Sequence, residues 1–247
     1  MEKIIKKYWD NRANTYSESI RDELCSFKKE AWKELIKKGV GEKKNIEALD
    51  LGTGPGFFAI IMSELGYNVT AVDCSHEMIQ EAKENAKISD VNINFIEGDI
   101  ENLDLPREKF DLIVCRNLTW TLKNPESTYE KWNSLIKKEG RLLIFDANWY
   151  LRLSNPTIQE EYDKTQRLLE DMGYKPKVKK EQKKECENIA RKLPLTYEIR
   201  PIWDKKVLLN CGFKKVEIDT DINNKIYTEK EKIAYKYSPM FCIGAFK

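Results

Sequence analysis

The sequence contains very few residues of the kinds that bind metals. It has one histidine, His76, among 247 residues, and no two of its six cysteines are spaced as C-x-x-C. A structural zinc site needs four close cysteine or histidine ligands, so this composition does not favour one. We therefore expect no metal, and reduced thiols of the kind found in the cytosol. The cysteines in question are Cys25, Cys74, Cys115, Cys186, Cys211 and Cys242.

Long apolar runs and an excess of one charge are also missing. No stretch approaches the roughly 18 to 20 apolar residues that cross a bilayer, and the amino-terminal residues lack the apolar run of a signal peptide. Lys and Arg number 43 against 41 Asp and Glu, so the net charge of +2 is far from that of a general nucleic-acid binder. We expect a cytoplasmic protein whose partner is neither a membrane nor a nucleic acid.

Strand-like and helix-like segments alternate from about residue 46 onward, which is typical of a parallel sheet covered by helices on both faces. The pattern predicts a Rossmann-like, doubly wound, mostly parallel sheet of seven strands. The expected strands are 45–51, 68–73, 92–97, 110–116, 140–147, 214–219 and 239–246, the last two forming an antiparallel pair. The expected helices between them are 56–65, 75–86, 125–138 and 201–211.

Two segments lie outside this alternation. Residues 1–40 are helical by pattern and form an expected amino-terminal cap, whereas 148–200 form an expected inserted helical lid. The core would then comprise 41–147 and 201–247. The insertion contains the lysine-rich stretch YKPKVKKEQKKECE from Tyr174 to Glu187. A solvated helical surface and a patch that binds RNA or phosphate are two interpretations of this stretch.

A glycine-rich turn follows the first predicted strand in EALDLGTGPGF, residues 47–57. Glycines at this place let the backbone approach a ligand closely and direct amide donors from the start of the helix toward it. The dinucleotide fingerprint G-x-G-x-x-G would need glycine where Phe57 stands, while the extra glycine is Gly56. Asp50 precedes the turn at the carboxyl end of the strand, where it can accept hydrogen bonds from a ligand's ammonium group.

The segment D-L-G-T-G-P-G, from Asp50 to Gly56, resembles the first motif of class I S-adenosylmethionine-dependent methyltransferases. Three further elements follow in the order of that family. Asp73 ends the second strand, where the resemblance implies that its carboxylate accepts both ribose hydroxyls. Asp99, in FIEGDIENL, would accept the adenine amino group. The segment 110–146 resembles the fourth strand, the helix after it and the fifth strand of the family. The implied cofactor is S-adenosylmethionine, and the implied activity is methyl transfer.

The amino-terminal YWDNRANTY resembles a W-x-x-R-A-x-x-Y segment of small-molecule members of the family, which folds over the methionine end of the cofactor. The resemblance implies that Trp9 and Tyr16 cover the sulfonium and that Arg12 pairs with the cofactor carboxylate. An ordinary packing helix with a solvent-facing Arg12 is the alternative. The complete set of expected cofactor-binding residues is Tyr8, Trp9, Arg12, Tyr16, Asp50, Gly52, Thr53, Gly54, Gly56, Asp73, Cys74, Met78, Asp99, Ile100 and Asn117.

Methyl transfer from a sulfonium is an in-line displacement, so positioning of the acceptor and exclusion of water can supply most of the acceleration. A general base is needed only for acceptors such as alcohols or ammonium groups. The single histidine, His76, lies at the expected adenine side, far from the methyl group. The candidate bases are Tyr16, Asp146 and Tyr150.

Aromatic residues follow the fourth and fifth strands, at the sheet edge where ligands bind in such folds. They suit a small acceptor that is cationic or flat. The segment after the fourth strand, from Arg116 to Trp120, lacks the Asn/Asp-Pro-Pro-aromatic pattern of enzymes that methylate base amino groups. Arg152 and Arg200 are candidate partners for a carboxylate, but their interpretation as solvated surface residues is favoured. The expected acceptor-binding residues are Trp120, Asn148, Trp149, Tyr150 and Trp203.

Three other functions remain open from the sequence. A methyltransferase acting on RNA or protein would use the lysine-rich insertion, and its binding would depend steeply on salt. A module that binds S-adenosylmethionine without turnover would keep the same motifs. A nicotinamide-dependent dehydrogenase is disfavoured by the displaced third glycine and by the Gly98-Asp99 pair.

Overall fold

The computed structural model describes residues 1–41, 43–174 and 178–247, and contains one seven-stranded sheet in the order β3-β2-β1-β4-β5-β7-β6. The strands β1 to β5 run parallel, and β7 pairs antiparallel with both β5 and β6. The predicted mostly parallel sheet with a closing antiparallel pair is confirmed. The strands are β1 (Glu47–Leu51), β2 (Asn68–Asp73), β3 (Asn94–Glu97), β4 (Phe110–Arg116), β5 (Ile136–Ala147), β6 (Lys215–Asp219) and β7 (Met240–Phe246).

Helices cover both faces of this sheet because successive side chains of each strand point to opposite faces. On β1, Leu49 and Leu51 join the core beneath α6 (Pro125–Leu135) and α9 (Ile202–Asn210). Ala48, the neighbour of Leu49 in the strand, joins the core beneath α3 (Lys28–Val40) and α4 (Phe57–Glu64). The helix α5 (His76–Ile88) packs beside α4 and β3. The strand order reverses between β1 and β4, which is where ligands bind in sheets of this type.

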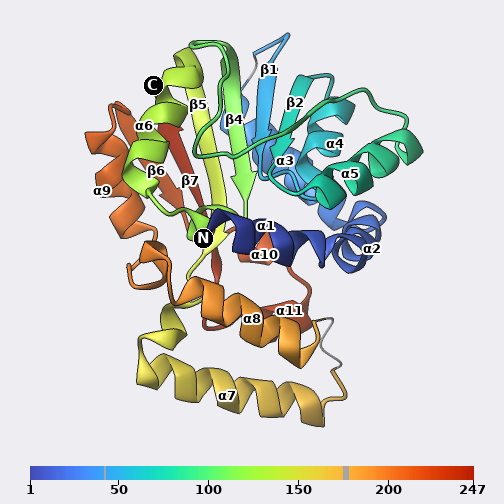
Figure 1. Ribbon diagram of the computed structural model, residues 1–247, viewed down its shortest axis with the longest axis vertical. Coiled ribbons are helices and arrows are strands. Elements are labelled where there is room, and N and C mark those ends of the chain that lie inside the picture. Colours follow the sequence, from blue (N-terminus) through green and yellow to red (C-terminus); the bar gives the residue numbers. More distant parts are fainter. Residues whose placement is uncertain (42, 175–177) are drawn as a thin grey trace.

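The amino-terminal helices do not form one cap. The helix α1 (Glu2–Asp10) lies across the carboxyl ends of the strands, and α2 (Ala13–Leu24) continues from it toward α5 (Figure 1). The third helix, α3, packs into the sheet core through Trp32 and Ile36, which are both almost fully buried. The expected cap of residues 1–40 is therefore reduced to α1 and α2, since the apolar face of α3 belongs to the core.

The chain between β5 and α9 forms η2 (Leu151–Leu153), α7 (Pro156–Asp171), α8 (Lys180–Ala190) and η3 (Pro194–Thr196). The helix α8 packs on α1 and places Cys186, Ile189 and Ala190 in a small buried cluster, while α7 lies beyond it (Figure 1). Two short helices, α10 (Asn223–Ile226) and α11 (Glu229–Ala234), precede β7 and contact α3 and α7 respectively. Of the lysine-rich stretch, residues 175–177 lie outside the described residues.

One predicted boundary is wrong. The helix expected over 125–138 ends at Leu135, and the next residues begin β5 instead of extending α6. The reason is tertiary: Ile136 is completely buried and pairs with Phe110 of β4, and the register then shifts before Leu112. A short apolar segment after a helix does not reveal by its sequence whether it continues that helix.

The cysteines of the protein are all free, and the described part of the chain contains no cluster of three or more acidic, cysteine or histidine side chains suited to a metal. Among the same residues, no helix is long and apolar enough to span a bilayer.

Candidate functional site

The turn after β1 is built from glycines in a backbone conformation that other residues rarely adopt. Gly52 and Gly54 have φ angles of 63° and 53°. The turn is anchored by Asp50, whose carboxylate accepts from the Thr53 hydroxyl at 2.6 Å and from the Ala59 amide in α4 at 3.0 Å. The backbone amide of Gly54 consequently faces the end of β2. The turn is therefore held in one conformation, and Gly54, where the turn comes closest to the end of β2, has no side chain.

Gly56 has a different role from the one expected. It also has a positive φ, of 91°, but a Cβ added there would lie 3.2 Å from the Cβ of Ala82 in α5. Gly56 lines neither of the cavities described below, among the residues that the structure describes. The absence of a side chain at Gly56 allows α4 and α5 to pack closely. Gly56 therefore has a structural role and is not a cofactor contact.

A cavity that opens partly to solvent lies at the carboxyl ends of β1, β2 and β4, beneath α1, and encloses about 780 Å³ when that open part is included. The structure brings ten of the expected cofactor residues to its wall: Trp9, Tyr16, Gly52, Gly54, Asp73, Cys74, Met78, Asp99, Ile100 and Asn117. Glu2, Ile5, Glu101, Arg116, Leu118, Thr121 and Lys123 also line it and were not foreseen.

Asp73 presents a fixed carboxylate to this cavity. One oxygen accepts from the Gly54 amide and the other from the Ser75 amide, each at 2.9 Å. The residue is only 8% exposed, and burial raises the pKa of its carboxyl while these amide bonds oppose the rise. Because each carboxylate oxygen has a further lone pair, both can still accept hydrogen bonds from a ligand.

We expect Asp73→Ala to weaken binding of S-adenosylmethionine by about 1 to 3 kcal/mol, because charge-assisted hydrogen bonds to buried hydroxyls would be lost. Calorimetric titration measures this difference. Glu84→Ala is a suitable control, since Glu84 is an exposed acid of α5 and does not line the cavity in the described part of the chain. Wild-type affinity in Asp73→Ala would remove this carboxylate from the binding site.

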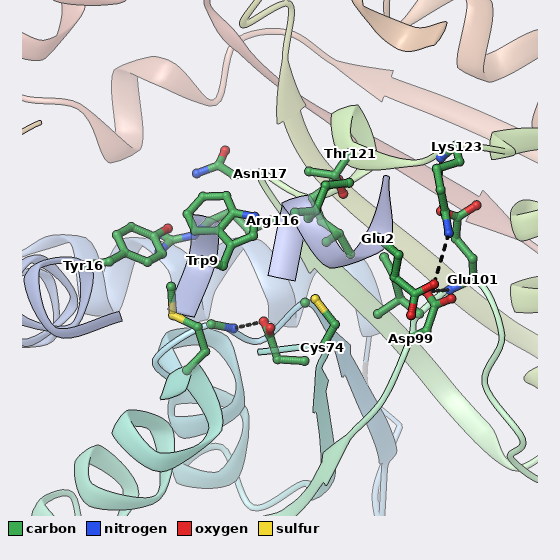
Figure 2. A pocket seen from close by; sticks show the side chains of 17 residues that line it. Glu2, Trp9, Tyr16, Cys74, Asp99, Glu101, Arg116, Asn117, Thr121 and Lys123 are labelled. Atoms are coloured by element: carbon green, nitrogen blue, oxygen red, sulfur yellow. Dashed lines mark hydrogen bonds and ion pairs between the residues drawn. The ribbon is translucent and has the colours of Figure 1, made fainter. Parts of the chain in front are cut away.

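Charged residues close one end of the cavity. Asp99 accepts from the Glu101 amide at 3.0 Å, and Glu101 in turn accepts from the backbone amide of Lys123 at 3.1 Å. The Lys123 ammonium lies 3.6 Å from Glu101 and 3.8 Å from Glu2 of α1 (Figure 2). An ion pair therefore joins α1 to the segment after β4 at this end, next to Asp99.

Aromatic residues and one arginine close the opposite end. The rings of Trp9 and Tyr16 lie side by side, with centroids 6.0 Å apart (Figure 2). Arg116, the last residue of β4, reaches the same end, and its guanidinium pairs with both oxygens of Glu23 at 2.7 and 3.1 Å. The local signal that could have indicated Arg116 is its position as a charged residue closing an apolar strand, whereas Glu23 becomes its partner only in the folded chain.

A second, smaller cavity, with about 290 Å³ of empty space, is lined by Asp50, Thr53 and Arg116. Gly52, Gly54, Tyr16 and Arg116 line both cavities. Burial of Asp50 raises the pKa of its carboxyl to about 7, against the lowering effect of its hydrogen bonds and of Arg116.

This shift predicts a pH-dependent affinity for the cofactor. The positive charges of S-adenosylmethionine favour the ionised carboxylate, so binding below about pH 7 must release a proton from Asp50. We expect the affinity to rise about tenfold per pH unit up to about pH 7 and then to level off. The same pKa shift has the opposite effect on the free energy of unfolding. Because the pKa of Asp50 is raised from 3.8 on folding, its contribution to the stability of the folded protein is complete below about pH 4 and is lost as the pH rises through about 7. Titration calorimetry in two buffers measures the proton release, and the same slope in Asp50→Asn would contradict its assignment.

Arg12 does not reach either cavity, contrary to expectation. It is 7% exposed, and its guanidinium donates to Thr15 and to Gln182 of α8, both at 3.2 Å. Tyr8 likewise faces away, into the cluster that contains Trp120 and Cys186. Both side chains lie on the side of the amino-terminal helices that contacts the insertion, and their expected contact with the cofactor is corrected accordingly.

Asp146 and Arg200 form a buried network, so neither has the role expected of it. Asp146 is fully buried and lies 3.0 Å from Arg200, which is 3% exposed and pairs with Asp204 at 2.8 Å. Asn148 exchanges two hydrogen bonds with the backbone of Arg200, at 2.7 and 3.1 Å. Asp146 is therefore no base, Arg200 is no surface residue, and Asn148 fastens the two ends of the insertion together.

The remaining aromatic candidates have structural partners. The indole of Trp120 donates to the Asn117 carbonyl at 2.9 Å, and that of Trp149 donates to Asp146 at 2.8 Å. The Tyr150 hydroxyl lies 2.9 Å from the Cys186 sulfur, and burial raises the pKa of this tyrosine well above its usual range, which makes it unsuited as a base. Trp203, a residue of α9, is partly buried and packs against the core, so we no longer assign it to the acceptor site.

The residues of the larger cavity fit an adenosyl ligand that carries an amino acid. Asp73 offers two acceptor oxygens for neighbouring hydroxyls, and the glycine turn leaves room beside it. Asn117, with a φ of 55°, places a buried side-chain oxygen at the wall that has no hydrogen-bond partner among the described residues. Buried polar atoms are rarely left without a partner, so this oxygen indicates a ligand donor.

Comparison with known proteins agrees with this geometry. A family model described as a methyltransferase domain matches residues 42–230. The chain is 34% identical over 145 residues to a release factor glutamine methyltransferase of Lactococcus lactis, covering 54% of this chain and 50% of that protein. It is 33% identical over 105 residues to a ubiquinone biosynthesis O-methyltransferase of Coxiella burnetii, covering 42% and 45%. The chain thus spans about half the length of these curated relatives.

Two solved structures share the fold. One, from Methanococcus maripaludis and described as an S-adenosylmethionine-dependent methyltransferase, has a TM-score of 0.61 and 18% identity, with coverage of 98% of this chain and 94% of that one. The other is phosphoethanolamine N-methyltransferase 2 of Haemonchus contortus in complex with S-adenosylmethionine, with a TM-score of 0.60, 16% identity and coverage of 87% and 51%. The family model covers most of the chain and shows that it belongs to the family of methyltransferase domains, and the two solved structures show that it shares the fold of class I S-adenosylmethionine-dependent methyltransferases.

Proposed function

We propose that the enzyme transfers the methyl group to a nitrogen, sulfur or oxygen atom of a small molecule. The observation that carries this proposal is that the chain roofs its own site. The helix α1 places Ile5 and Trp9 in the cavity wall, and its other face packs on α8 of the insertion. A large acceptor needs an open surface next to the methyl group, whereas a roofed cavity favours a small one.

The proposed placement of the cofactor follows the charges at the two ends of the cavity. Asp99 and the apolar Ile100 and Met78 suit the adenine, and Asp73 suits the ribose hydroxyls. Trp9 and Tyr16 then lie over the sulfonium, because aromatic faces attract cations. Cys74 borders the adenine from the end of β2.

The cofactor supplies an electrophilic methyl group, and the protein needs only to position the acceptor and exclude water. Tyr16 is the remaining candidate base, since its ring lines both cavities and Asp146 and Tyr150 are excluded by their burial and partners. The acceptor is proposed to lie in the cavity beside Trp9 and Tyr16, whose rings form its wall at this end. Aromatic walls there suit a cationic or flat molecule.

A protein or RNA acceptor is the second candidate. One relative is named for methylating a protein, release factor, and the other for ubiquinone biosynthesis. A groove between α7 and α11 is lined by Lys164, Lys232 and Lys236, which could contact an anionic macromolecule. The groove lies between α7 of the insertion and α11 and shares no described residue with the wall of the cofactor cavity, so it supports this alternative only indirectly.

Formation of S-adenosylhomocysteine tests the proposal directly. The protein would be incubated with S-adenosylmethionine and separate panels of small amines, thiols, imidazoles and phenols, and with release factor and RNA. Gly54→Val, which we expect to abolish cofactor binding, is the control. We expect turnover with a small molecule whose rate changes little between about 50 and 200 mM salt. Turnover only with RNA or protein, falling steeply over that range, would favour the alternative.

A further inference from the structure

We propose that Arg116 binds the α-carboxylate of S-adenosylmethionine, the contact that the sequence led us to expect from Arg12. The proposal concerns the cofactor and is independent of the identity of the methyl acceptor. It rests on the position of Arg116 between the two cavities, on the way its guanidinium is held, and on the opposite charge of Asp50 beside it.

Arg116 lies where the two cavities meet. It lines both of them, together with Tyr16, Gly52 and Gly54. Its side chain is largely enclosed by protein but still 11% exposed, and the residue forms part of the wall of each cavity. Arg12, by contrast, lines neither cavity within the described chain and contacts α8. Of these two arginines, only Arg116 can meet a ligand that extends past the glycine turn.

The guanidinium of Arg116 is held firmly but is not saturated. It lies over the rings of Phe57, Phe58 and Trp32, at 4.4, 5.1 and 5.4 Å from their centroids. Glu23 takes one N–H from each terminal nitrogen, and its own position is fixed by the Trp32 indole at 3.0 Å. A guanidinium has five N–H donors, so three remain for a second anion. Such a fork is suited to bidentate binding of a carboxylate.

The charges around the smaller cavity complement an α-amino acid. Asp50 and Arg116 both line it, and each favours the charged form of the other. The zwitterionic end of S-adenosylmethionine carries one ammonium and one carboxylate. With its ammonium toward Asp50, its carboxylate would face Arg116. Glu23 already balances the positive charge of Arg116. The negative charge of the ligand's carboxylate is therefore balanced by the ligand's own ammonium and sulfonium groups.

The test compares two ligands that differ only in the carboxylate. Affinities for S-adenosylmethionine and for its decarboxylated form, which keeps the ammonium and sulfonium, would be measured by titration calorimetry in the absence of acceptor. We expect Arg116→Gln to weaken binding of S-adenosylmethionine about 10- to 100-fold and that of the decarboxylated form less than about 3-fold. Arg12→Gln is the matched control and should leave both affinities unchanged.

Arg116→Gln leaves Glu23 without its cation, so the double variant Arg116→Gln/Glu23→Gln is measured alongside it. A third variant, Arg116→Lys, keeps the positive charge but loses the planar fork of the guanidinium. Each of these should show the same selective loss. The proposal is overturned if both ligands lose affinity equally in the folded variants, if S-adenosylmethionine binds Arg116→Gln as it binds the wild type, or if the selective loss appears in Arg12→Gln instead.

Discussion

Replacing Arg200 with methionine is expected to destabilise the fold by about 3 to 5 kcal/mol, because two buried carboxylates would lose their shared cation. Asp146 and Asp204 are both fully buried, and Arg200 donates to them at distances of 2.8 to 3.0 Å. The Tyr129 hydroxyl, which donates to Asp204 at 2.7 Å, cannot replace a positive charge. Urea unfolding measures the loss as a lower midpoint.

The matched control for this experiment is Arg191→Met. Arg191 is an exposed arginine of the same insertion, and within the described residues its guanidinium donates only to a backbone carbonyl, at 3.4 Å. We expect it to change the free energy of unfolding by less than about 0.5 kcal/mol. A loss below about 1 kcal/mol in Arg200→Met would mean that the two acids do not depend on this arginine.

Replacing Gly54 with valine is expected to abolish cofactor binding while leaving the enzyme folded. A Cβ at Gly54 would lie 3.5 Å from the Tyr16 ring, an ordinary contact, so the protein has room for it. That room is the cavity which both residues line, and the two methyl groups of valine would occupy it. We expect the affinity for S-adenosylmethionine to fall by more than about 100-fold, equivalent to about 2.7 kcal/mol. Titration calorimetry measures it.

Backbone strain is the confounding effect, because Gly54 has a positive φ that valine adopts only at a cost of about 1 to 2 kcal/mol. Gly66→Val is the control: Gly66 has a φ of 81°, and a Cβ added there meets nothing within 4 Å. Both variants should lose similar stability, and only Gly54→Val should lose the cofactor. If Gly66→Val lost it as well, strain and not occupancy would explain the result.

The strands and the turn of the site could be predicted because their signals are local. The bounds of β2 and β4 are as expected, since short apolar runs that end in a polar residue mark the strands of a parallel sheet. The glycines after β1 mark their turn within a few residues. Ten expected residues consequently came together in one cavity, because the carboxyl ends of parallel strands meet at one edge.

The wrong expectations concern side chains whose partners are distant in the sequence. Arg116 pairs with Glu23, 93 residues earlier, and Arg200 with Asp146, 54 residues earlier. Nothing near either arginine shows that an acid will approach it, so Arg200 was interpreted as a surface residue. Trp203 and Tyr150 were expected to face the acceptor, but aromatic residues near a site pack into a core equally well, and only the fold shows which they do.

The sequence by itself determined the strands of the sheet, the glycine turn and the positions of Asp73 at the end of β2 and Asp99 after β3. Each of these features depends on residues that are close together in the sequence. Tertiary structure alone decided which arginine faces the cavity, which acid is a neutralised part of the core, and that α1 and α8 together roof the site. The physical reason is burial. A charged side chain that is removed from water needs a partner, so its role depends on the partner that the fold supplies, and the sequence does not reveal that partner.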